Sequence, residues 1–314
     1  MTDYSELTTR DAYGKMLVEL GKDNHNIVVL DADVSRSTMT KYFAAAYPDR
    51  FIECGLAEQN MVSIAAGLAS CGKISFVSTF AVFASCRCFD QVRMCVAQPN
   101  TNVKIVATHG GITVGEDGSS HQAIEDLALY CSLPNFSVIV PADSIETAAV
   151  IKAVTDTVGP FYVRLARSKT PVIYGAGCDF KVGKASLLLD GSDATIIATG
   201  MLVSTALAAA KSLAGEGIRC RVLNMSTLKP IDREAIIAAA SRTGAVVTAE
   251  EHLLHGGLGS IVAQVLSTSH PVPLESLGIN DHYCKSGKPE ELLAMNGLAA
   301  SDIEQAVRAA IKRK

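Results

Sequence analysis

Short apolar runs rich in valine and isoleucine alternate along the chain with longer segments whose apolar positions recur at helical spacing. The runs are almost continuously apolar, which is typical of strands that are covered on both faces of a parallel sheet. Regular alternation of such strands with helices indicates an α/β fold. The pattern predicts strands over residues 27–30, 74–78, 103–108, 137–140, 161–163, 194–198, 219–223, 246–249 and 272–274.

Three of the longer segments carry helix caps and apolar stripes. Thr8 or Thr9 can cap the first, and Gly21 predicts its end. A second apolar stripe begins behind the glutamate at position 58 and stops near residue 72. Asp143 or Ser144 can start the third helix, over residues 145–154.

The alternation pauses in a segment rich in glycine and proline, which indicates a crossing between domains. A chain of 314 residues also fits two domains on size. We therefore expect two α/β domains with parallel sheets, over residues 1–167 and 190–314, joined by a linker over residues 168–189.

Composition narrows the class of protein. Hydrophobic residues make up 48% of the chain and charged residues 19%, which excludes intrinsic disorder. The net charge of −4 suggests neither nucleic acid nor a membrane as partner. No apolar stretch reaches the roughly 18 residues of a membrane helix, and the polar N-terminus does not resemble a signal peptide. Nine scattered cysteines without a C-x-x-C pair indicate free thiols and a cytoplasmic protein.

Two motifs in the second half are weak. Gly257-x-Gly259 resembles part of a dinucleotide fingerprint, but the third glycine is missing, so a plain tight turn is favoured. His252 and His255 are one helical turn apart, but a third metal ligand is not evident. A polar loop at a strand end is the favoured interpretation of the histidine pair.

The segment 108–122 carries the most chemical information. It directly follows a predicted strand, and ligands bind at the carboxyl ends of strands in parallel sheets. Its glycines allow the backbone to approach a ligand closely, and His109 and His121 can donate to an anion or move protons near neutral pH. The segment is predicted to be part of an active site.

Two further segments become candidates for the site only when they are considered together with the segment 108–122. Glu58 stands at a predicted helix start, where a glutamate commonly complements the helix dipole. Phe80 and Phe83 follow another strand, and by themselves such residues are more often part of the core than a stacking platform.

Taken in order, the strings GLAEQNM, STFAVF, THGGITVGEDGSSHQ and VRLAR closely resemble the C-terminal half of transketolases. The resemblance covers essentially the whole chain and implies a pyrimidine-binding domain followed by the transketolase C-terminal domain. It also implies thiamine diphosphate and Mg²⁺ as cofactors. The G-D-G segment that marks the diphosphate- and Mg²⁺-binding domain of this family is absent. The resemblance therefore implies one subunit of a split transketolase, with the Mg²⁺ ligands on an N-terminal partner chain, in an α₂β₂ heterotetramer.

The same resemblance assigns roles to individual residues. Glu58 matches the glutamate that binds N1′ of the cofactor's aminopyrimidine and promotes its imino tautomer. Phe83 matches the aromatic residue that stacks on this ring, and Phe80 lines the same pocket. Asp33 matches an aspartate near the cofactor, although it could equally be a helix cap.

Other matches concern the sugar-phosphate substrates. Asp117 and His121 would hold sugar hydroxyls beside the reacting carbonyl, with His121 also counted among the catalytic residues. The acceptor's phosphate would be contacted by Arg10, Ser37, His109 and Arg167. Arginine suits a phosphate because its planar fork donates two hydrogen bonds at once.

Three positions depart from the family pattern. Cys86 stands where the family often has tyrosine, Gly110 replaces a frequent aspartate, and Arg36 adds a charge beside Ser37. These departures leave the acceptor open, and a sulfonated sugar is conceivable.

The implied activity is transfer of a two-carbon ketol unit from a ketose phosphate to an aldose phosphate. No catalytic residue maps to the C-terminal domain, which would serve packing and dimer contacts. The alternatives are a deoxyxylulose-phosphate synthase, a 2-oxo-acid dehydrogenase β-subunit and a non-catalytic regulatory homologue. The substrate loop fits the dehydrogenase poorly, and retention of Glu58, His109, Asp117 and His121 argues against a regulatory role.

Overall fold

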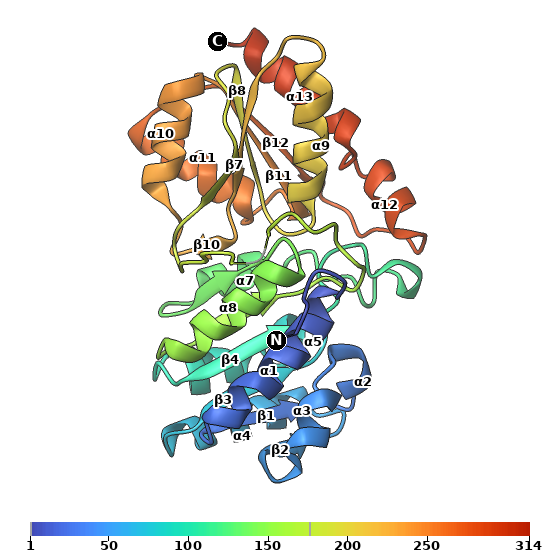
Figure 1. Ribbon diagram of the computed structural model, residues 1–314, viewed down its shortest axis with the longest axis vertical. Coiled ribbons are helices and arrows are strands. Elements are labelled where there is room, and N and C mark those ends of the chain that lie inside the picture. The colour runs from blue at the N-terminus through green and yellow to red at the C-terminus, as the bar shows by residue number, and fades with distance from the viewer. Residues whose placement is uncertain (1, 176) are drawn as a thin grey trace.

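The computed structural model describes residues 2–175 and 177–314. It forms two α/β units, with the N-terminal unit in the lower part of Figure 1 and the C-terminal unit in the upper part. Each unit is built around a mostly parallel sheet, which confirms the predicted fold class. In the described residues, no helix is both long and apolar enough to cross a membrane. All nine cysteines lie in this part of the chain and none of them forms a disulfide.

The first sheet has seven strands in the described residues, in the order β10-β5-β6-β4-β3-β1-β2. All neighbours are parallel except β10 and β5. The strands are β1 (Ile27–Asp31), β2 (Phe51–Glu53), β3 (Ile74–Ser78), β4 (Val103–Ala107), β5 (Ser137–Ile139), β6 (Phe161–Arg164) and β10 (Thr227–Lys229).

Helices cover both faces of this sheet. On one face, α1 (Thr9–Asp23) and α8 (Ser144–Asp156) pack side by side over a core that includes Leu17 and Ile151. On the other face, α4 (Glu58–Ser70) packs through Met61. The side chains of Thr8 and Asp143 cap α1 and α8 as predicted, but α1 continues past the predicted stop at residue 21.

The second sheet has five described strands, in the order β12-β11-β8-β9-β7. Helices α9 and α13 pack on one face, and α10 and α11 bury the other face in a core that is continuous with that of the first unit. The elements are β7 (Ser186–Leu189), β8 (Ala194–Ala198), α9 (Leu202–Ala214), β9 (Cys220–Asn224), α10 (Arg233–Thr243), β11 (Val246–Leu253), α11 (Leu258–Ser269), β12 (Leu274–Ile279), α12 (Pro289–Met295) and α13 (Ala300–Lys312).

Short helical elements fill the connections on the first unit. They are α2 (Ser35–Thr38), α3 (Lys41–Ala46), η1 (Pro48–Arg50), α5 (Ala81–Cys86), α6 (Phe89–Gln91), the π-helix η2 (Val92–Ala97), η3 (Gly115–Asp117) and α7 (Asp126–Ser132). Three of them, α2, α5 and η3, follow the carboxyl ends of β1, β3 and β4, where candidate site residues lie.

The edges of both sheets differ from the prediction. Strands β7 and β10 are antiparallel and were not predicted, because β7 is only half-buried and β10 is short. Strand β12 begins at Leu274, where the segment 272–274 was predicted to end. Because β7 lies inside the predicted linker and β10 joins the first sheet from the second half, the division at residues 168–189 stays a prediction.

Candidate active site

Four neighbouring strands of the first sheet bring the candidate residues to one edge. In the sheet order, β6, β4, β3 and β1 are adjacent and parallel, so their carboxyl ends meet. Ser37 follows β1, Phe80 follows β3, His109 follows β4 and Arg167 follows β6. A bridge between Phe80 and Thr108 extends the pairing of β3 and β4 to the site. The site therefore lies where parallel α/β sheets bind ligands.

The aromatic and imidazole rings form one cluster. Phe80 and Phe83 are stacked with their centroids 5.6 Å apart, and Phe80 stacks on His109 at 3.9 Å. His121 meets Phe83 edge-on at 5.4 Å and Phe80 at 6.2 Å. The four rings, two from the start of α5 and two from the segment 108–122, thus lie together beside the ends of β3 and β4.

Glu58 is the first residue of α4 and its side chain is only 5% exposed. Its Oε1 accepts a hydrogen bond of 2.9 Å from Arg87, whose side chain is 50% exposed. The guanidinium carbon of Arg87 also lies 3.7 Å from the centroid of the Phe83 ring. A cavity of about 450 Å³ opens beside this pair, lined by Leu56, Ala57, Glu58, Gln59, Asn60 and Arg87. The sequence analysis did not single out Arg87.

Two arginines and a carboxylate lie close to the segment 108–122. Arg10 donates to the backbone carbonyls of Ser37 at 2.6 Å and Arg167 at 3.0 Å. Arg167 pairs with Asp117 at 3.3 Å and donates to the carbonyl of Val114. Arg10 Nε is buried and has no partner among the described residues. Burial lowers the pKa of Arg10, and the nearby Arg167 adds to this effect against the opposing charge of Asp11. The unpaired donor and the two adjacent cations suit an anionic ligand.

His109 is held in a strained backbone conformation. Its φ is +62°, and the side chain is almost completely buried. The hydroxyl of Thr108 lies 2.8 Å from Nδ1, so with that hydroxyl as donor the ring proton is on Nε2. The pKa of His109 is lowered to about 3, mainly by burial and to a smaller extent by the charges of Arg10, Arg167 and His121. Of the two roles considered for His109, donating to an anion and moving protons near neutral pH, a pKa this low favours the first.

We expect the NMR signals of the His109 ring to show no titration from about pH 8 to about pH 5 in the free chain. The pKa of about 3 lies below the ordinary value of 6.5, so protons bind the unfolded chain more tightly than the folded one. The contribution of His109 to stability is thus present above pH 6.5 and is lost as the pH falls towards 3. A titration midpoint near 6.5 would contradict the neutral ring.

Asp33 does not form the helix cap that was its alternative role, because α2 has no side-chain cap. Its side chain is exposed, its φ is +62°, and its backbone N–H donates to Glu53 at 2.8 Å. The buried Asp31 holds this segment instead, accepting from Val34 N and Thr38 Oγ1 at 2.7 Å each. Burial raises the pKa of Asp31 to about 6. A role of Asp33 near a cofactor stays a prediction.

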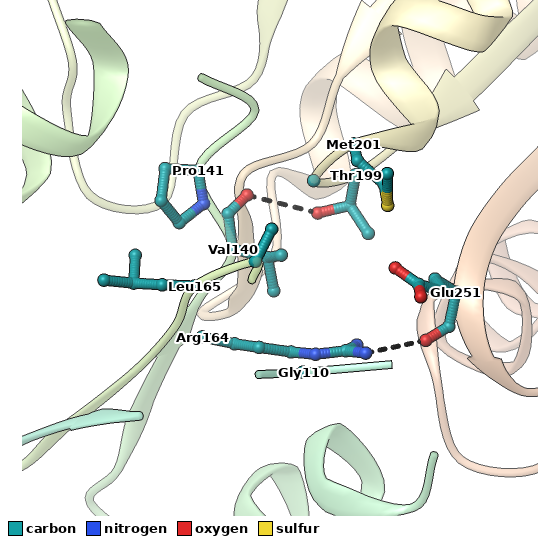
Figure 2. A pocket seen from close by; sticks show the side chains of 10 residues that line it. Gly110, Val140, Pro141, Arg164, Leu165, Thr199, Met201 and Glu251 are labelled. Atoms are coloured by element: carbon teal, nitrogen blue, oxygen red, sulfur yellow. Dashed lines mark hydrogen bonds between the residues drawn. The ribbon is translucent and has the colours of Figure 1, made fainter. Parts of the chain in front are cut away.

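The side chain of Arg164 explains why glycine stands at position 110, where the transketolase pattern often has aspartate. A Cβ built on Gly110 would lie 2.6 Å from Cγ of Arg164, whose side chain runs along the glycine backbone (Figure 2). Arg164 is 5% exposed and lies 3.4 Å from Asp126. It also donates to the carbonyl of Glu251 at 2.8 Å (Figure 2). Arg164 therefore connects the segment 108–122 to strand β11. Arg164 belongs to the VRLAR string, but the string does not reveal its partners, which are remote in the chain.

The weak motifs have structural explanations. The turn at Gly257 is confirmed as a plain turn before α11, because the carboxylate of Glu250 accepts from Leu258 N and Gly259 N where an anion would bind. The interpretation of His252 as part of a polar loop is wrong, since it is buried within β11 and its Nε2 accepts from Ala128 N at 3.3 Å. The described residues contain no cluster of metal-ligating side chains.

Glu58 and Phe83 together contact one planar, nitrogen-rich group. The Arg87 guanidinium lies on the face of Phe83 and donates to the Glu58 carboxylate. These are the contacts that an aminopyrimidine with a protonated ring nitrogen would make. No comparable cradle for a diphosphate or Mg²⁺ is evident in the described part of this chain.

Comparison with known families matches both units. Residues 5–172 match the transketolase pyrimidine-binding domain, and residues 183–303 match the transketolase C-terminal domain. A putative transketolase C-terminal section from Methanocaldococcus jannaschii is 47% identical over 97% of this chain and 96% of the relative. A 6-deoxy-6-sulfo-D-fructose transketolase subunit from Clostridium is 42% identical over 97% of this chain and 95% of the relative.

A solved structure described as an inactive β4 tetramer of a split-gene transketolase is similar over the whole chain. Its TM-score is 0.93, with 51% identity over 98% of this chain and 99% of that chain. Mammalian transketolases are about twice as long, and the chain covers only 50% of the human enzyme.

Proposed function

Because this chain belongs to the transketolase family, we propose that it is the C-terminal subunit of a split, thiamine-diphosphate-dependent transketolase. Its reaction moves a two-carbon ketol unit from a ketose phosphate to an aldose phosphate. The observation that carries the proposal is the cluster in which Glu58 and the Phe80–Phe83 stack stand beside the histidine loop and the Arg10–Arg167 pair.

A separate N-terminal chain completes the enzyme. The chain covers half of the human transketolase, and a relative of nearly equal length is described as a C-terminal section. The partner would hold the diphosphate and Mg²⁺, in an α₂β₂ assembly with active sites between subunits. Light scattering of the purified two-chain complex tests the assembly, and a stable 1:1 heterodimer would contradict it.

The chain's own residues bind and orient the reactants. When bound, thiamine diphosphate supplies the carbanion that attacks the donor ketose. Glu58 would hydrogen-bond N1′ and favour the imino form of the aminopyrimidine, so that the exocyclic nitrogen would serve as a base. Phe83 stacks on the ring and Phe80 supports Phe83. The neutral His109 donates from Nε2 to a substrate oxygen.

The remaining polar side chains select the sugar. His121 lies against Phe80 and Phe83, close to the reacting carbon, and Asp117 binds a hydroxyl. Arg10 and Arg167 bind the terminal anion, and the unpaired Nε of Arg10 supplies one donor. Mixing the chain with its N-terminal partner, thiamine diphosphate and Mg²⁺ tests the proposal. Ketol transfer between sugar phosphates supports it, and pyruvate decarboxylation would instead favour one of the related thiamine-diphosphate enzymes.

Arg167→Ala should raise the KM for a phosphorylated aldose by about 10- to 150-fold, the usual worth of a charged hydrogen bond. The same variant also removes the ion-pair partner of Asp117. The KM for an unphosphorylated aldose should therefore be measured with the same variant. Arg313→Ala removes a surface arginine paired with Glu275 and serves as the matched control. An unchanged KM for the phosphorylated aldose would argue that another group binds the anion.

A sulfonated acceptor or donor is the second candidate. The similar Clostridium protein is described as a 6-deoxy-6-sulfo-D-fructose transketolase subunit, and Arg36 places an exposed extra cation beside Ser37. A sulfonate and a phosphate differ in charge but share the oxygen acceptors that arginine recognises. Comparing kcat/KM for sulfonated and phosphorylated sugars decides between them.

A further inference from the structure

Arg87 has no role in the proposed reaction, yet it contacts both groups expected to receive the cofactor ring. Its NH1 donates to Glu58 at 2.9 Å, and its guanidinium lies over Phe83 at 3.7 Å. The backbone carbonyl of Arg87 accepts from the amide of Gln59 at 3.0 Å, which fixes the main chain beside α4. The side chain itself is half-exposed, so it can leave without disturbing the core.

The guanidinium matches the chemistry of an aminopyrimidine. Both groups are planar and carry N–H donors in the plane, and both can stack on an aromatic face. A carboxylate that binds one of them cannot bind the other at the same oxygen, and a single face of Phe83 cannot carry both. Arg87 therefore occupies the place that the proposed function gives to the ring.

We propose that Arg87 is a placeholder that closes the aminopyrimidine half-site in the cofactor-free subunit and must swing out before thiamine diphosphate binds. The proposal rests on the proposed function. The placeholder also keeps the nearly buried carboxylate of Glu58 paired until the cofactor replaces it. The half-site is thereby held in its binding geometry in the absence of the ring.

Arg87 closes the half-site in part of the molecules, and only the open molecules bind the cofactor. The apparent association constant is therefore the intrinsic constant multiplied by the open fraction. The stacking and the half-exposed ion pair together are worth about a 3- to 30-fold difference in that fraction. Because the competition exists only in the free state, it slows association and leaves dissociation unchanged.

The test uses the reconstituted two-chain enzyme with Mg²⁺ and thiamine diphosphate as the probe. Arg87→Ala should lower the Kd from calorimetry by about 3- to 30-fold and raise the stopped-flow association rate by the same factor. Arg87→Lys keeps a charge but loses the planar stack and should fall between Ala and the wild type. Arg93→Ala, a nearby exposed arginine that donates to Met94, is the control and should not change the Kd.

An unchanged or weaker Kd in Arg87→Ala, or a change confined to the dissociation rate, would overturn the placeholder. In that case the wild type still binds thiamine diphosphate and the proposed function stands. If the wild-type assembly itself binds no thiamine diphosphate and transfers no ketol unit, the proposed function fails, and the placeholder fails with it.

Discussion

Glu58→Ala should lower turnover of the reconstituted enzyme by roughly 10²–10⁴, the usual scale for loss of a group in proton-transfer catalysis. The carboxyl lies at the buried start of α4, within reach of a ring stacked on Phe83. Without it, nothing stabilises the imino form of that ring, and the exocyclic nitrogen stays a poor base. Glu58→Gln keeps the shape and one donor but not the acidity, so it should also lose most of the turnover.

The measurement is kcat with saturating thiamine diphosphate and saturating sugars, which separates chemistry from binding. Glu290→Ala is the matched control, because Glu290 is also a first-turn glutamate, exposed at the start of α12. It tests whether loss of a helix-terminal carboxylate by itself affects the enzyme. Near-normal turnover in Glu58→Ala would remove Glu58 from the mechanism.

Arg164→Met should destabilise the chain by about 3–5 kcal/mol, the cost of removing one partner from a buried ion pair. Arg164 lies 3.4 Å from Asp126, and Asp126 also accepts from the Tyr162 hydroxyl at 2.6 Å. Although burial lowers the pKa of Arg164, the charges of Asp126 and Glu251 outweigh that effect and raise it. With methionine at position 164, these carboxylates lose the cation that offsets their burial.

Urea unfolding of the wild type and of Arg164→Met, followed by circular dichroism, measures the difference. Arg313→Ala removes an exposed arginine that pairs with Glu275 at 2.5 Å, and it should cost less than about 1 kcal/mol. A similar small loss for Arg164→Met would show that the contact between the two units depends on other residues. Because Arg164 packs along Gly110, the variant should also loosen the loop that carries His109.

The strands whose bounds could be predicted are those that helices bury on both faces of a sheet. Strands β3 and β8 have the predicted bounds, because a parallel strand between helices on both faces leaves an uninterrupted apolar run. Strand β7 is half-buried with alternating exposure, and it pairs antiparallel at an edge. Such a strand resembles a loop in sequence, so its position was missed.

In the candidate site, too, some features could be predicted from the sequence and others could not. His109 and Phe80 each follow a predicted strand, and because these strands are neighbours in the parallel sheet, the two rings are stacked. The neutral state of His109 depends on burial and on two arginines from remote segments, which no local pattern reveals. Arg87 and Arg164 were missed for the same reason, since their carboxylate partners are far away in the chain.

A crystal structure of the two-chain assembly with thiamine diphosphate tests the central claim most directly. We predict that the Glu58 carboxyl lies within hydrogen-bonding distance of N1′, that Phe83 stacks on the aminopyrimidine, and that the partner chain binds the diphosphate. A Glu58 side chain turned away from the ring, or an aminopyrimidine bound elsewhere, would contradict the account.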